Sequence, residues 1–251
     1  MSELTGLYAL WLREFKVFLR EKSRIVSSLV QPLLWLVVFG GGLGSAISLG
    51  GIGVNYQTFI YPGILAMTAL FGSLFFGLYL ILDKRVDFMK EVLVAPLRRI
   101  TMFFGKVLGG ATDGLIQSVI LIALGTFFGI HYTAFKVAMT LFFMALLIIS
   151  MVSIGLALGS VMESPEGFGL VGTFLIFPLF FLSGALYPIK SLPAWLGLFV
   201  VINPLTYVVD GLRTVLLGIS TFGLGIDIAV AIGFAVATVI IGGYLFGKMK
   251  I

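Results

Sequence analysis

The sequence predicts an all-α integral membrane protein with six transmembrane helices, an N-terminal amphipathic interface helix and a re-entrant external helical hairpin before the last span. Of its 251 residues, 60% are hydrophobic and only 11% are charged, whereas a soluble domain carries about 25% charged residues. The mean hydropathy is +1.17. A soluble protein of this length has too few charged residues to cover so much apolar surface.

The six predicted spans are apolar runs that reach the length needed to cross a bilayer, about 20 residues. They are residues 25–49, 59–82, 107–130, 137–162, 168–187 and 228–246. A seventh run, 192–202, is too short to cross and is bracketed by Pro188, Pro193 and Pro204. It predicts a re-entrant or interfacial helix within an external hairpin, residues 188–213. We treat residues 1–251 as a single transmembrane domain.

The basic residues predict the orientation of the spans. With the N-terminus inside, thirteen of the 16 Lys and Arg residues lie in cytoplasmic segments, and only Lys136, Lys190 and Arg213 lie outside. This asymmetry predicts that both termini are cytoplasmic in a multi-pass protein of the plasma or inner membrane. The net charge of +5 therefore reflects membrane topology, and we expect the lipid bilayer, not nucleic acid, as its partner. The first span is too long for a signal-peptide core, so we expect it to remain as a transmembrane helix.

Residues 4–21 predict the amphipathic interface helix. Apolar residues recur there at three- and four-residue spacing: Leu4, Leu7, Tyr8, Trp11, Leu12, Phe15, Phe18 and Leu19. The charged residues fall largely away from that stripe: Arg13, Glu14, Lys16, Arg20 and Glu21. Such a helix lies in the plane of the lipid head groups. The alternative is a solvated lead-in to the first span.

The loop between the second and third spans, residues 83–106, contains a second cytoplasmic element. Asp87 is placed to cap a short helix that starts at Phe88 and stops at Pro96. One side of this helix is apolar: Phe88, Met89, Val92 and Leu93. An apolar ridge surrounded by charges suits docking into a groove of a cytoplasmic partner. The residues alone equally allow a loop whose charges only set the topology.

Few residues of the sequence are suited to catalysis or to binding a metal or a nucleotide. The chain has no cysteine and one histidine, His131, which leaves no thiolate metal site, zinc site or serine hydrolase triad. Residues 242–248 have the spacing of a phosphate-binding loop, but Met249 follows where that motif has Ser or Thr. We therefore expect no catalytic residue, metal or cofactor on this chain, and a chain that is not itself an enzyme.

Two carboxylates, Asp113 and Asp227, fall within the spans. An isolated intramembrane carboxylate is a functional candidate, but both lie near a predicted membrane surface and are expected to reach the head groups in a structural role. This scarcity of charge argues against an ion channel or an ion-coupled carrier. Small-residue pairs such as Gly105 with Gly109 and Gly155 with Gly159 offer sites for close helix approach, although chance pairs are expected in so glycine-rich a chain.

The external segment carries a more specific pattern. It reads Phe181-Leu-Ser-Gly184, Tyr187-Pro188, Leu192-Pro193, Asn203-Pro-Leu-Thr-Tyr207 and Asp210-Gly-Leu-Arg213. Together with Tyr61-Pro-Gly63 and Glu91-Val-Leu-Val-Ala-Pro-Leu-Arg-Arg99, this pattern closely resembles the type-2 ABC transporter permeases. The branch it most resembles includes the daunorubicin-resistance and nodulation-factor export permeases.

The resemblance implies a six-span permease that works as a dimer, expected to be a homodimer, with two copies of a separate ATP-binding subunit. ATP and magnesium are then expected on that partner, and the cargo is expected to be amphipathic, lipid-like or drug-like. The alternatives are an ATP-independent channel or ion-coupled carrier, and a lipid-modifying membrane enzyme.

The resemblance also implies roles for residues of this sequence. Coupling to the ATPase falls to Asp87, Phe88, Glu91, Val92, Leu93, Pro96, Arg98 and Arg99. The external gate hairpin contains Tyr187, Pro188, Pro193, Asn203, Pro204, Asp210 and Arg213. The interface helix contains Trp11, Arg13, Phe15 and Arg20. Asp210 and Arg213, three residues apart on a helix, are spaced to pair with each other at the surface.

Overall fold

The computed structural model describes residues 2–42, 54–89, 97–189 and 192–249, and within these ranges every regular element is a helix. The elements are α1 (Glu3–Arg20), α2 (Lys22–Trp35), the π-helical η1 (Leu36–Gly42), α3 (Tyr56–Phe75), α4 (Gly77–Arg85), α6 (Arg99–Gly125), the 3-10 turn η2 (Thr126–Phe128), α7 (Ala134–Val161), α8 (Pro165–Phe181), α9 (Ala194–Ile202), α10 (Pro204–Leu217) and α11 (Leu224–Gly247).

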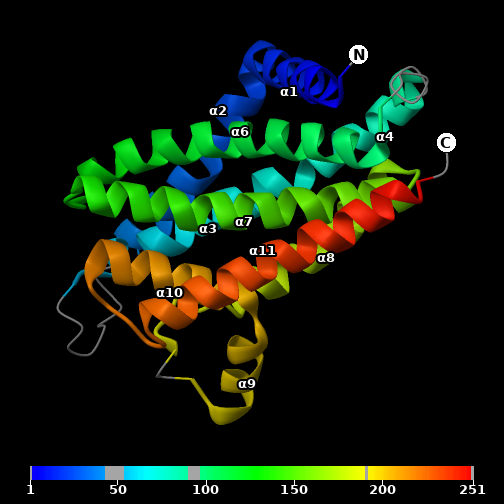
Figure 1. Ribbon diagram of the computed structural model, residues 1–251. Helices are drawn as coiled ribbons and strands as arrows, with labels where there is room; N and C mark the ends of the chain where they lie inside the picture. Colours follow the sequence, from blue (N-terminus) through cyan, green and yellow to red (C-terminus); the bar gives the residue numbers. More distant parts are fainter. Residues whose placement is uncertain (1, 43–53, 90–96, 190–191, 250–251) are drawn as a thin grey trace.

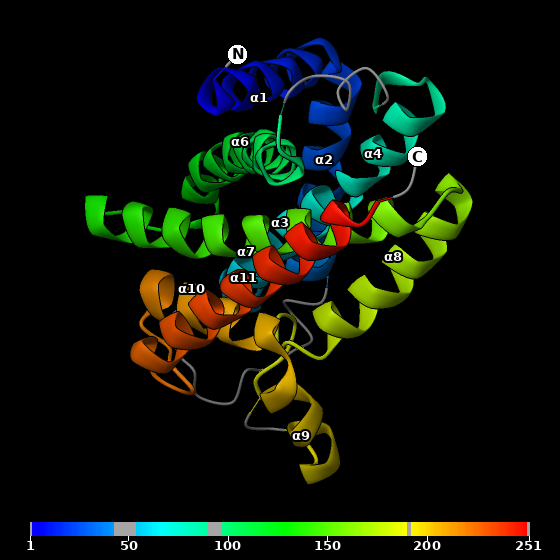
Figure 2. The ribbon, with the colours of Figure 1, turned by 45° about the vertical axis from the view of Figure 1, so that its right-hand side comes forward.

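The helices form a bundle around α7, which packs against α3, α4, α6, α10 and α11 (Figure 1). α1 lies outside this bundle, against α6. Figure 2 shows α9 extending away from the bundle at the opposite side from α1. Five of the described helices start where a short polar side chain accepts a backbone N–H, as expected of N-caps. These caps are Ser2 for α1, Asn55 for α3, Thr133 for α7, Ser164 for α8 and Asn203 for α10.

In the part of the chain that the structure describes, four helical segments are long and apolar enough to cross a membrane: Tyr56–Arg85, Arg99–Phe128, Ala134–Val161 and Leu224–Gly247. A fifth is counted if α9 and α10, which meet at 83°, are taken as one broken span. Two further apolar helices, Val26–Gly42 and Pro165–Phe181, are shorter. The six-span count thus remains a prediction, because residues 43–49 of the first predicted span lie outside the described residues and α8 is short for a crossing.

Glycines set the closest helix contacts. If Gly77 of α4 were replaced by a larger residue, the added Cβ atom would lie 2.0 Å from the carbonyl oxygen of Gly155 on α7. A Cβ atom added in the same way to Gly159 would lie 2.5 Å from the carbonyl oxygen of Gly77. The backbones of α4 and α7 therefore touch directly, as small residues permit. Lys84, at the end of α4, donates to the carbonyls of Gly159 and Ser160 at the end of α7, at 2.8 and 3.0 Å. Both helices therefore end on the same side of the bundle.

We call that side the junction end. It gathers α1, the end of α4, the start of α6 and the end of α11, and both chain termini lie near it (Figure 1). The motif-like residues 242–247 lie inside α11, where Gly242 packs against Phe103 of α6. They form the end of a helix, not the loop that a phosphate-binding motif requires.

Candidate functional site

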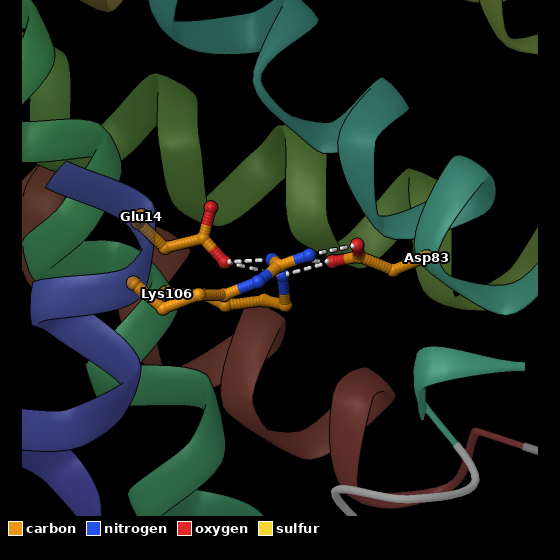
Figure 3. Close-up of polar contacts among 4 residues, drawn as sticks. Glu14, Asp83 and Lys106 are labelled. Carbon is orange, nitrogen blue, oxygen red and sulfur yellow. Dashed lines mark hydrogen bonds and ion pairs between the residues drawn. The ribbon is translucent and has the colours of Figure 1, made fainter. Parts of the chain in front are cut away.

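Four charged side chains from three helices meet at the junction end, and we call them the charge cluster: Arg13 and Glu14 of α1, Asp83 of α4 and Lys106 of α6. The Lys106 ammonium lies 2.6 Å from Asp83 Oδ2 and 2.9 Å from Glu14 Oε1 (Figure 3). The Arg13 guanidinium donates to both oxygens of Asp83, at 2.7 and 3.1 Å, and to Glu14 at 2.7 Å. The two positive and two negative charges of the cluster therefore cancel, and its net charge is zero.

The charge cluster is buried. The side chains of Lys106, Glu14 and Asp83 are 3%, 4% and 9% exposed, and only Arg13 reaches solvent, at 33%. Burial of the guanidinium lowers the pKa of Arg13, but the hydrogen bonds to Asp83 and the charges of Glu14 and Asp83 outweigh it and raise the pKa above its ordinary value. Removing one partner of a buried ion pair leaves an uncompensated charge. The geometry therefore holds α1, α4 and α6 together.

Glycines of α6 allow α1 to come this close. A Cβ on Gly109 would lie 2.5 Å from Glu14 Cβ, and a Cβ on Gly105 would lie 2.9 Å from Leu10 Cβ. The indole of Trp11 donates to Thr112 Oγ1 at 2.9 Å, further along the same helix. α1 therefore runs along the first turns of α6 in the same direction, and the Gly105–Gly109 pair is a helix contact.

The buried face of α1 differs from the predicted stripe. The buried residues of α1 are Gly6, Leu10, Glu14 and Phe18, whereas Leu4, Tyr8 and Leu19 are exposed. The expectation that Glu14 lies on the charged outer side is wrong, because Lys106 provides it with a buried partner. Trp11 stacks on Phe15, and Arg20 is exposed in the last turn. The position of the exposed apolar residues in the head-group plane remains a prediction.

The segment between α4 and α6 contacts α1 at both ends, and we call residues 86–98 the coupling segment. At its start, Asp87 has a positive φ of 56°, and the ring of Phe88 lies under the Arg13 guanidinium, 3.9 Å from atom to centroid. Phe88 and Met89 are helical. Glu91, Val92, Leu93 and Pro96, which the resemblance implicates in coupling, lie outside the described residues. The described residues 86–89 form the first flank of the coupling segment, and residues 97 and 98 form the second. Arg13, which also belongs to the charge cluster, contacts the first flank.

The second flank of the coupling segment rests on the first turn of α1. A Cβ on Gly6 would lie 2.3 Å from Leu97 Cδ2, so the leucine occupies the space that the glycine leaves. The Glu3 carboxylate accepts from the Arg98 backbone N–H at 3.3 Å and from the Thr101 hydroxyl at 2.5 Å. The neighbouring Arg99 donates to the Gly247 carbonyl of α11 at 2.8 Å. α1 thus bridges the two flanks.

The external hairpin departs from expectation at its two charged residues. Asp210 and Arg213 are both buried, and each has a partner other than the one expected. Arg213 donates to the Gly184 carbonyl at 2.8 Å and lies over the Phe59 ring at 4.1 Å. The Asp210 carboxylate accepts from the backbone N–H groups of Thr221 and Phe222 at 2.9 and 3.0 Å. The two residues fix different loops, and the expected surface pair is wrong.

The corner of the hairpin is built on Asn203. Its amide donates to the Leu179 carbonyl at 2.7 Å, and its side-chain oxygen accepts from Leu205 N at 3.0 Å. Pro193 precedes α9 and Pro204 opens α10, which are positions where a missing N–H has no cost. The Tyr187 hydroxyl donates to the Phe181 carbonyl, and Pro188 follows in non-helical, half-buried backbone. Asn203 and Pro204 stand at the 83° turn between α9 and α10.

The two intramembrane carboxylates do not reach the surface. Asp113 and Asp227 are 2% and 0% exposed. The expectation that they reach the head groups is therefore wrong, because both side chains are buried inside the protein.

The comparisons with known proteins identify the family. A sequence model of the ABC-2 type transporter family matches residues 5–217. The chain belongs to this family. It is 32% identical to the inner membrane transport permease YadH of Escherichia coli K12 over 244 residues, which cover 92% of this chain and 91% of that protein. It is 26% identical to nodulation protein J of Rhizobium leguminosarum bv. trifolii over 218 residues, 84% of this chain and 80% of that protein.

This ABC-2 type permease is thus a multi-pass membrane protein of a transport family. The matched region contains α1 except for its first two residues, the described parts of the coupling segment, the charge cluster and the hairpin as far as the end of α10.

Proposed function

We propose that this chain is the transmembrane subunit of an ATP-driven exporter. Two copies of the permease assemble with two copies of a separate ATP-binding subunit, which holds ATP and magnesium. The permease alternates between states that open inward and outward, and it moves an amphipathic, lipid-like or drug-like cargo out of the cell. The junction end then faces the cytoplasm, with both termini.

The observation that supports this proposal is the position of the charge cluster beside the coupling segment. Asp83 and Lys106 stand on either side of that segment and are joined by an ion pair. A force applied to the segment therefore reaches α4 and α6 together. Close-packed helices respond to such a force by shifting as rigid bodies.

α1 extends this connection. It contacts the coupling segment through Glu3, Gly6 and Arg13 and contacts α6 through Leu10 and Glu14. Movement of the ATP-binding subunits against the segment would then be shared by α1, α4 and α6. The resemblance places Glu91, Val92 and Leu93 at the centre of the docking surface, with Arg98 and Arg99 beside it.

Co-purification tests the proposal. The chain is expressed with a candidate ABC ATP-binding subunit, purified in a mild detergent by a tag on the permease, and examined for stoichiometry and ATPase activity. We expect equal amounts of the two chains and an ATPase activity that depends on the permease. A permease that is purified alone, and that leaves the activity of the added subunit unchanged, would contradict the proposal.

A further inference from the structure

The end of α11 is tied to the first turn of α6, directly beyond the coupling segment. The Arg99 guanidinium donates to the carbonyl oxygens of Gly247 and Met249, at 2.8 and 2.9 Å. The last carbonyls of a helix have no intrahelical partner, and they carry a partial negative charge. Arg99 therefore caps α11 and at the same time fixes it to α6.

Apolar contacts join the same two helix ends. The rings of Phe103 on α6 and Phe246 on α11 lie 5.7 Å apart between centroids, and both side chains are fully buried. If Gly243 of α11 were replaced by a larger residue, the added Cβ atom would lie 3.1 Å from Ile100 Cδ1 of α6. The start of α6 and the end of α11 therefore pack directly against each other, and a shift of one moves the other.

The opposite end of α11 is tied to the external hairpin. Asp210 of α10 accepts from the backbone N–H groups of Thr221 and Phe222, in the loop that leads into α11. The Phe222 ring also packs against the Tyr207 ring of α10, at 4.9 Å between centroids. From this loop α11 runs without a proline as one helix, Leu224–Gly247, a length of about 36 Å. It therefore connects the coupling side of the bundle to the hairpin.

α11 is also better placed to shift than α7, the helix at the centre of the bundle. In its most apolar stretch only 22% of the residues of α11 are buried, against 61% for α7. The middle of its buried face consists of small residues: Ala231, Ala235, Thr238 and Gly242. Small side chains interlock little with a neighbouring helix, and packed helices can slide past each other by small shear movements. α11 can therefore pass on a displacement along its own axis.

We propose that α11 carries the movement of the coupling segment to the external hairpin, and that Arg99 is the positioning residue that fixes the end of α11 for this step. This role rests on the proposed function, because the ATP-binding subunits start the movement. It differs from a place beside the docking surface, since the Arg99 guanidinium faces the carbonyls of α11. Asp210 fixes the opposite end.

Thiol labelling of the assembled complex tests this role. The chain has no cysteine, so Thr214→Cys places a single thiol on α10, at a half-buried position beside the loop that Asp210 holds. This permease is co-purified with the ATP-binding subunit, and the maleimide labelling of the permease chain is followed with and without ATP. We expect ATP to raise the labelling rate as the hairpin moves. ATP hydrolysis and the amounts of the two chains are measured on the same sample.

Three variants in this background show whether Arg99 acts through α11. Arg99→Met should lower the ATP-dependent increase about fivefold, the effect of losing one hydrogen bond, while the ATP-binding subunit stays bound and hydrolyses ATP. Arg99→Lys keeps a donor for the carbonyls and should restore most of the increase. Lys248→Met is the matched control, because it removes a cation at the same helix end that contacts Tyr244 of α11 itself. It should leave the increase unchanged.

A variant at the other end keeps the test decisive. Asp210→Asn weakens the tie to the loop and should also lower the increase, even if Arg99→Met proves unstable. An increase as large in Arg99→Met and Asp210→Asn as in Lys248→Met, or a complex whose labelling does not respond to ATP, would overturn this role of α11. A permease that neither binds the ATP-binding subunit nor changes its ATPase activity would instead contradict the proposed function.

Discussion

The Lys106 ammonium and the Asp83 carboxylate, 23 residues apart in sequence, form a buried ion pair of 2.6 Å that joins the two helices on either side of the coupling segment. The same ammonium lies 2.9 Å from Glu14, so the N-terminal helix is fixed at this point as well. The end of α4 and the start of α6 therefore cannot separate without breaking a buried ionic contact.

Lys106→Met should strongly destabilise the permease. The change leaves the two buried carboxylates with Arg13 alone, and breaking a buried ion pair costs about 3–5 kcal/mol. Thermal unfolding in detergent measures the effect, with Lys16→Met, at an exposed position of α1, as the control. If both variants unfold at the wild-type temperature, Lys106 is not the buried partner of Glu14 and Asp83.

Gly109→Ala should loosen α1 from α6. The added methyl group meets Glu14 Cβ at 2.5 Å, and overpacking of this kind costs about 1–3 kcal/mol. Gly233 of α11 has open space around the same position. Gly233→Ala should therefore keep or raise stability, by up to about 1 kcal/mol from helix propensity. Denaturant titrations of the two variants give the comparison, and equal tolerance would mean that α1 does not pack as described.

Arg13→Gln should uncouple ATP hydrolysis from the permease while the bundle stays folded. The substitution removes the paired hydrogen bonds to Asp83 and the contact with Phe88, at a position that is partly exposed. Loss of hydrogen bonds to a charged group, about 1.5 kcal/mol or more, corresponds to at least a tenfold change, which we expect in the permease-dependent ATPase rate. Arg20→Gln, on an exposed turn of the same helix, serves as the control. Equal ATPase rates in the two variants would remove Arg13 from the coupling path.

Asp210→Leu should destabilise the hairpin more than Asp210→Asn does. Leucine leaves the partly buried N–H groups of Thr221 and Phe222 without an acceptor, at up to about 1–3 kcal/mol each, whereas asparagine retains one oxygen in place. Unfolding temperatures in detergent distinguish the two. A leucine variant as stable as the asparagine variant would show that this carboxylate does not hold the loop.

The apolar runs predict the long helices well, because hydrocarbon length and hydropathy are local properties of the sequence. Two further signals were available in the sequence for the starts of α8 and α10, the pairs Ser164–Pro165 and Asn203–Pro204, because a cap and a proline act within a single turn. The family resemblance, based on short motifs, is confirmed by the match over residues 5–217.

The charge cluster could not be found in the same way. Helical spacing assigns Glu14 to the charged side of an amphipathic helix, and its partner Lys106 lies 92 residues away. The signal that could have joined them is the Gly105–Gly109 pair, which marks where another helix fits against α6. The partners of Asp210 and Arg213 could not be predicted for a related reason, since helical spacing predicts neighbours on one helix but not backbone partners such as Gly184 and Thr221.

Site-specific crosslinking tests the central claim most directly. The chain has no cysteine, so a single cysteine carrying a photoreactive crosslinker reports one position. Val86, 73% exposed in the coupling segment, and Phe127, 82% exposed at the other end of α6, form a matched pair. The account predicts that Val86→Cys crosslinks to the ATP-binding subunit in the assembled complex and Phe127→Cys does not. Crosslinking from Phe127→Cys, or from neither position, would contradict it.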